Sequence, residues 1–232
     1  MVKGASFHNR QPCIALKIRS LLTSLTENPS ENEKITPKLE YWIEYVLSER
    51  FATVDELVEG VSTVMWELSD PCARSVARFL KEFRDAPGRS GQAGSFVDKL
   101  CERILRWFAI ASVENLGMDN SPGLIVSHGG CSFIRVASFV GYLIEWGLLG
   151  HKLVKRHLVK PLTAHHYTSN GLCGPEYVRV TAIYQLLIAA GNTLLRGLLE
   201  PEDVQACFEA LDTSKIPGLD AEKLQVRWTA HH

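Results

Sequence analysis

The sequence lacks several features that would assign the chain to a well-characterised functional class. Its six cysteines form no Cys-x-x-Cys pair, which argues against a zinc knuckle or a thioredoxin-type redox site. The chain also lacks a glycine-rich nucleotide-binding motif, a His-Glu-x-x-His zinc motif and a Gly-x-Ser-x-Gly nucleophile elbow. We therefore expect no catalytic residue, no cofactor and no metal site, and we predict that the protein is not an enzyme.

A strong net charge and a membrane-spanning segment are missing as well. The formal net charge of −1 excludes a uniformly basic surface of the kind that coats nucleic acid. The longest uncharged apolar run, residues 180–195, includes Gln185 and Asn192, whereas a transmembrane helix needs about 20 apolar residues. Residues 1–12 are polar and show no signal-peptide pattern, so we predict a flexible N-terminal segment. Together these features favour a cytoplasmic protein with reduced thiols, and a nuclear location stays open.

Strand patterns are scarce, and helical periodicity dominates the chain. The one strand candidate, residues 124–126, is too short to build a sheet. Apolar residues recur with the period of a helix in about ten segments, which predicts a single all-α domain over residues 13–232. The clearest apolar stripe consists of Val54, Leu57, Val58, Val61, Met65 and Leu68.

Capping patterns mark several of the predicted helix boundaries. Thr53 and Glu56 have the spacing of a capping box, in which two side chains satisfy the first N–H groups of a helix. A capping side chain before a proline predicts two further helix starts, at Thr36-Pro37 and at Asp70-Pro71. Helices of this length, joined mostly by short turns, favour an open solenoid, and a closed helical bundle is the alternative.

One segment has an uneven charge distribution. Between Trp146 and Pro175 the chain has no acidic residue. The segment contains four cations, three of which follow at intervals of four residues and so share one face of a helix: Lys152, Lys155, Arg156 and Lys160. Clustered cations bind phosphates because binding releases condensed counterions, so we predict that these residues contact RNA or an acidic partner. The alternative is a solvated helix face whose charge is balanced by nearby acids.

Four segments keep an order and spacing that carry a family resemblance. Residues 18–28 have the pattern of a short opening helix, although Glu27 stands where the related pattern has proline. Residues 55–71 run from an apolar helix into an acidic-proline turn, and residues 96–108 suit a long central helix. Residues 133–149 give the best match, with an internal glycine and a Gly-Leu-Leu turn. Taken in order, these segments resemble the middle domain of eukaryotic initiation factor 4G.

This resemblance covers about residues 13–228 and implies a HEAT-type solenoid of five antiparallel helix pairs. It implies a non-enzymatic scaffold in mRNA translation or RNA metabolism that binds a DEAD-box RNA helicase or another mRNA-associated protein. The chain is closest in size to the small stand-alone members of that family. The expected partner contacts lie on turns after the two best-matching segments, at Ser69, Asp70, Glu145 and Trp146. Direct binding of RNA and formation of a homodimer stay open.

A functional alternative comes from another class of protein. The long break at residues 117–130 is rich in glycine, serine, asparagine and proline. A helical enzyme or a small-molecule-binding protein could have its pocket beneath this loop. A deep apolar pocket with converging polar groups would favour that alternative, whereas a shallow charged surface would favour the scaffold.

Overall fold

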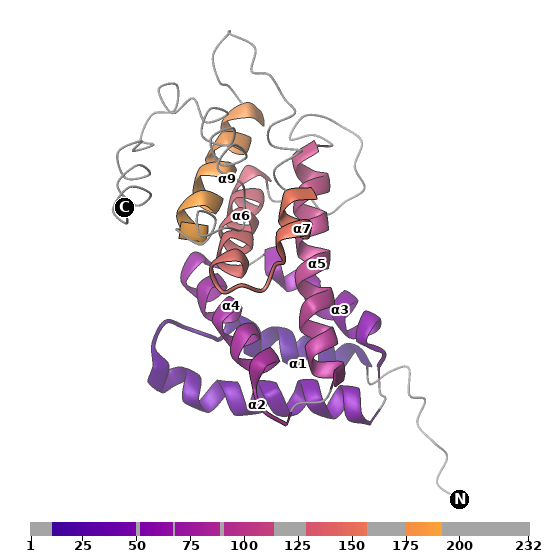
Figure 1. Ribbon diagram of the computed structural model, residues 1–232. Helices are drawn as coiled ribbons and strands as arrows, with labels where there is room; N and C mark the ends of the chain where they lie inside the picture. Colours follow the sequence, from indigo (N-terminus) through magenta and orange to yellow (C-terminus); the bar gives the residue numbers. More distant parts are fainter. Residues whose placement is uncertain are drawn as a thin grey trace, which may run out of the picture. The chain divides into compact units, whose positions relative to one another are not determined.

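The protein is helical throughout the part of the chain that the structure describes (Figure 1). The structure is a computed structural model, and it describes residues 11–49, 52–66, 68–88, 91–113, 129–156 and 175–191. These residues contain no strand, which confirms the all-α prediction. The helices are α1 (Gln11–Thr23), α2 (Pro29–Ser48), α3 (Val54–Ser62), the 3-10 helix η2 (Thr63–Trp66), α4 (Asp70–Asp85), α5 (Gly91–Val113), α6 (Gly129–Glu145), α7 (His151–Val154) and α9 (Pro175–Ala190).

The start of α2 differs from the prediction. Pro37 lies inside this helix, so the expected start at Thr36-Pro37 is wrong. The helix begins two turns earlier, where the side chain of Asn28 accepts a hydrogen bond from the backbone N–H of Ser30 at 3.1 Å. Pro29 follows at the first position, where the N–H that proline lacks would have no partner inside the helix.

The predicted capping box at the start of α3 is confirmed. The hydroxyl of Thr53 accepts a hydrogen bond from the backbone of Glu56 at 3.2 Å, and the Glu56 carboxylate accepts one from the backbone of Thr53 at 2.8 Å. The apolar stripe that begins in α3 is buried from Leu57 onward, while Val54 is half-buried, and the helix is not continuous. It ends at Ser62 and tightens into η2, whose three-residue period still turns Met65 toward the core.

The chain divides into two compact units, residues 1–100 and 101–232, and the boundary falls inside α5. In the first unit α1 packs against α2, α3 and α4, and its buried side chains include Ile18 and Leu22. The prediction of one domain over residues 13–232 stays a prediction. Residues 192–232 of the predicted domain lie outside the described residues, as do residues 1–10 of the predicted N-terminal segment, whereas Gln11 and Pro12 of that segment already belong to α1.

In the second unit α6 and α9 pack side by side and run in the same direction (Figure 1). Gly141, near the end of α6, lies against the last turn of α9. An ideal Cβ atom built on Gly141 would lie 2.5 Å from the carbonyl oxygen of Leu186 and 2.6 Å from the Cβ of Ala189. The two backbones approach this closely because neither helix places a large side chain at the contact. No helix in the described part of the chain is long and apolar enough to cross a membrane.

We predict that Gly141→Ala destabilises the protein, by about 1–3 kcal/mol, because the added methyl group forces α6 and α9 apart. The matched control is Gly94→Ala in α5, where an added Cβ meets no atom within 4 Å. Since alanine has the higher helix propensity, the control is expected to leave stability unchanged or to raise it by up to about 1 kcal/mol. Urea unfolding followed by circular dichroism measures both changes. Equal stability of the two variants would show that the close approach is absent.

Candidate functional site

The first predicted partner contact is the turn that leads into α4. Ser69, Asp70 and Pro71 are all exposed. Ser69 occupies the N-cap position with extended backbone, and its side chain makes no capping hydrogen bond. The prediction that Asp70 supplies the cap is wrong, because Asp70 is already the first residue of the helix. At that position its negative charge still interacts favourably with the helix dipole.

The base of this turn is attached to the end of α1. The thiol of Cys72 donates to the carbonyl of Leu22 at 3.4 Å, and the hydroxyl of Ser75 donates to the carbonyl of Thr26 at 2.6 Å. The side-chain amide of Asn32 also donates to the Thr26 carbonyl, at 2.7 Å. These bonds satisfy carbonyl groups in the last turn of α1 and just after it, where a helix leaves acceptors without intrahelical partners. The exposed turn at Ser69 is therefore anchored by the hydrogen bonds that the first turns of α4 make to the end of α1 and to Thr26.

The second predicted contact is the turn after α6, which has the geometry of a Schellman motif. Gly147 adopts a φ of 64°, a conformation that glycine tolerates and other residues rarely adopt. Its N–H donates to Ile144 at 2.9 Å, and the N–H of Leu148 donates to Leu143 at 2.8 Å. Leu148 is buried, as the apolar contact of this motif requires. The Gly-Leu-Leu pattern is thus explained by the motif, in which Gly147 adopts the left-handed conformation and Leu148 makes the buried apolar contact.

Glu145 and Trp146 lie at the edge of this second turn and are half-buried. The indole nitrogen of Trp146 is buried and has no hydrogen-bond acceptor within the described structure. A buried N–H without an acceptor is unfavourable, so a water molecule or a partner group that accepted this bond would be stabilising. The turn at Ser69 belongs to the first unit and the turn at Trp146 to the second, so each is a separate candidate contact.

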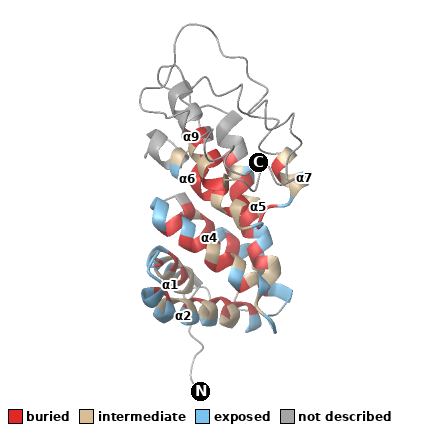
Figure 2. Cartoon of the chain, turned by 60° about the vertical axis from the view of Figure 1, so that its left-hand side comes forward, coloured by how far each residue is buried: buried red, intermediate tan, exposed pale blue. Residues whose placement is uncertain are grey.

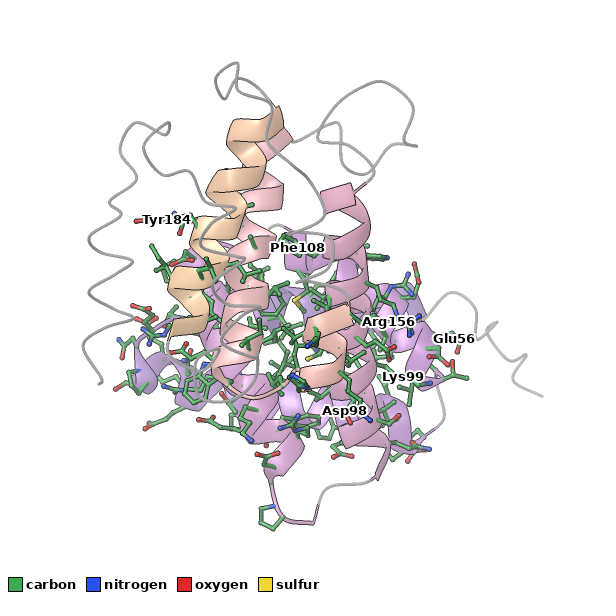
Figure 3. All side chains as sticks on the ribbon, turned by 45° about the horizontal axis from the view of Figure 1, so that its top comes forward. Glu56, Asp98, Lys99, Phe108, Arg156 and Tyr184 are labelled. Carbon is green, nitrogen blue, oxygen red and sulfur yellow. The ribbon has the colours of Figure 1, made fainter. Side chains whose placement is uncertain are left out.

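The predicted cation stripe is only partly described. Lys152 and Arg156 are exposed, Lys155 is half-buried, and Lys160 lies outside the described residues. Val154, in the same helix, is buried. The α-helical stretch of α7 is short, and the backbone widens to a π-turn at residues 155–156, so the regular four-residue spacing does not hold throughout. Arg156 is labelled at the end of this helix in Figure 3.

Sequence reasoning missed an aromatic cluster on α2. The rings of Tyr41 and Tyr45 stack at 5.7 Å with an interplanar angle of 14°, and Trp42 meets both rings edge-on. Lys17 of α1 places its ammonium group 4.0 Å from the centre of the Trp42 ring. The available signal was the pair of tyrosines four residues apart, on the side of α2 opposite its apolar stripe.

Several exposed charges of the first unit, on α3, α4 and α5, form ion pairs. Lys99 of α5 lies 2.9 Å from the carboxylate of Asp55 at the start of α3, and Figure 3 shows Lys99 near Glu56 of the same turn. Hydrogen bonds from Lys81 and then Arg84 lower the pKa of the Asp85 carboxyl. Exposed pairs of this kind contribute at most about 1 kcal/mol each, so they orient side chains more than they stabilise the fold.

The alternative function would place a pocket beneath the loop at residues 117–130. The loop at residues 117–130 lies outside the described residues apart from the first two residues of α6. In the portion of the chain that the structure covers, no three His, Cys, Asp or Glu side chains are close enough to hold a metal ion. Comparisons with models of known protein families, with curated proteins and with solved structures find no match for the chain. The resemblance to the initiation-factor domain therefore stays a prediction.

We predict that ionisation of the Cys72 thiol lowers the free energy of unfolding at high pH. Burial raises the pKa of its thiol from 9.0 to about 11. Between these values the folded protein keeps the thiol proton while the unfolded chain loses it, so rising pH favours unfolding. The contribution is complete below pH 9 and is lost as pH rises toward 11, with a slope of at most about 1.4 kcal/mol per pH unit.

The measurement compares urea unfolding of the wild type and of Cys72→Ala across this range. Lysines and tyrosines titrate here too, but they are common to both proteins and cancel in the difference. We expect the wild type to lose its advantage over the variant as pH rises. If the difference in the free energy of unfolding between the two proteins stayed constant as pH rises through this range, the raised pKa would not belong to Cys72.

Proposed function

We propose that the protein is a non-enzymatic helical scaffold in mRNA translation or RNA metabolism. The observation that carries the proposal is the parallel packing of α6 and α9. In a helical-repeat protein, equivalent helices of neighbouring repeats stack in parallel, and the intervening helix returns the chain between them. This arrangement supports a HEAT-like solenoid, as the sequence resemblance implies.

The two candidate turns support a role in protein binding. A scaffold presents the turns between its helices to a partner, because side chains there can vary without disturbing the core. Ser69 and Asp70 are exposed on a turn held by α1, and Trp146 offers an aromatic surface with a buried N–H. Tryptophan is enriched among the residues that dominate binding energy at interfaces.

A DEAD-box RNA helicase is the proposed partner. A scaffold changes a helicase's activity only if it binds one conformation of the helicase more tightly than the other. The physical requirement is modest, because a preference of about 1.4 kcal/mol for the closed state shifts the equilibrium about tenfold. Contact with either turn would provide such a preference if only the closed state of the helicase makes it.

The helicase partner predicts an effect of changing either turn. Asp70→Lys and Trp146→Ala should each weaken binding to a purified helicase, by about tenfold or more, and should reduce any stimulation of its RNA-dependent ATP hydrolysis. The control is Glu33→Lys, which makes the same charge change at an exposed acid of α2. Isothermal calorimetry and an ATPase assay provide the readouts. Absence of binding to every helicase tested would remove this partner, and hydrolysis by the protein alone would overturn the non-enzymatic proposal.

The cation stripe predicts salt-dependent RNA binding in the second unit. If Lys152, Lys155, Arg156 and Lys160 contact four phosphates of single-stranded RNA, affinity should fall with salt on a log–log slope of about −3. Changing all four residues to glutamate should weaken RNA binding and make the salt slope shallower. Circular dichroism checks that the variant folds. An unchanged affinity and an unchanged slope would make the stripe an ordinary solvated surface.

A further inference from the structure

The outward face of α2 combines cations with aromatic rings. Lys34, Lys38, Tyr41 and Tyr45 follow at intervals of four, three and four residues. At 100° per residue these positions fall within an arc of about 60° on the helix. Both lysines are exposed, and the exposed fraction of Tyr41 is 58%. The buried side chains of the helix, among them Leu39 and Ile43, lie on the opposite face, and Figure 2 shows exposed residues along α2.

The aromatic part of this face is held in place by its neighbours. Tyr41 stacks on Tyr45, and Trp42 packs edge-on against both rings, with centroid distances of 5.5 and 5.8 Å. The ammonium group of Lys17 covers the Trp42 ring and connects the cluster to α1. Tyr41 is the most exposed of the three aromatic residues. A flat group could therefore stack on it without first ordering the ring.

The acidic residues of α2 lie either at the ends of this face or outside it. Glu31 is engaged at the start of the helix, where its carboxylate accepts hydrogen bonds from Thr26 and Asn28. Glu49 follows the last turn of the helix. The remaining acids lie away from the face, about 90–130° from its centre by the same helical geometry: Glu33, Glu40 and Glu44. From Lys34 to Tyr45 the face therefore carries positive charge and aromatic surface.

We propose that this face of α2 binds single-stranded nucleic acid, with phosphates on Lys34 and Lys38 and a base stacked on Tyr41. A nucleotide offers both a negative charge and a flat ring, which matches a cation beside an aromatic side chain. The face is about 16 Å long at 1.5 Å per residue, which accommodates several nucleotides. An acidic peptide would form ion pairs with the two lysines, but its side chains would gain little binding energy from the exposed ring of Tyr41. The inference does not depend on the helicase partner, and it uses residues of the first unit only.

The test is the binding of a short fluorescent oligouridine to the full chain, measured by anisotropy. Tyr41→Ala should weaken binding about 5- to 100-fold, and Tyr41→Phe should bind like the wild type because the ring remains. Replacing Lys34 and Lys38 together with glutamine should make the log–log salt slope shallower by about 1.4. The matched control is Lys81→Gln on α4, whose ammonium group is paired with Asp85.

An abasic oligonucleotide of the same length separates stacking from charge. It should bind the wild type more weakly than oligouridine does, and Tyr41→Ala should not weaken it further. Equal binding of the two oligonucleotides, or of a polyglutamate peptide, would overturn the proposal, as would an unchanged affinity in Tyr41→Ala. Loss of oligouridine binding only in the Lys152 and Arg156 variants would also overturn it, while leaving the proposed scaffold function intact.

Discussion

The carbonyl groups at the end of α1 impose the constraint around which the first unit is organised. A helix leaves its last four carbonyls without partners inside the helix, and burying them unpaired is unfavourable. Here the thiol of Cys72 on α4 donates to the carbonyl of Leu22 in the last turn of α1. The hydroxyl of Ser75 on α4 and the amide of Asn32 on α2 both donate to the carbonyl of Thr26, three residues after the helix ends. The same contacts fix the beginnings of both helices relative to α1. Loss of these donors would therefore affect three helices at once.

This arrangement separates the two kinds of surface on the first unit. The polar atoms of Cys72 and Ser75 point inward to α1, while Ser69 and Asp70, a few residues earlier, are exposed. On α2, Leu39 and Ile43 face the core while the tyrosines face outward. Exposed groups can thus take part in binding without contributing to stability. A binding surface built in this way can change without requiring a compensating change in the core.

The sequence predicted the helical class, the buried stripe of α3 and the capping box at Thr53, because each follows from local spacing. It misplaced the start of α2, because Asn28-Pro29 has the same starting pattern as Thr36-Pro37 and supplies the cap that the helix uses. The cation stripe was inferred from a regular helix, and the π-turn after Val154 changes that regularity. The aromatic cluster was missed because the spacing of Tyr41 and Tyr45 does not show that Trp42 packs against both rings and lies beneath Lys17 of another helix.

The parallel packing of α6 and α9 has a topological consequence for the segment that joins them. Parallel neighbours require the chain to travel back along their length, which is about 24 Å for the 16 residues of α9. The 29 residues from Trp146 to Gly174 could span roughly four times that distance if extended. The return path is therefore far longer than the topology demands. The topology therefore does not fix the number of residues in this crossover, whereas packing constrains those of its residues that are buried, among them Leu148, Leu149 and Val154.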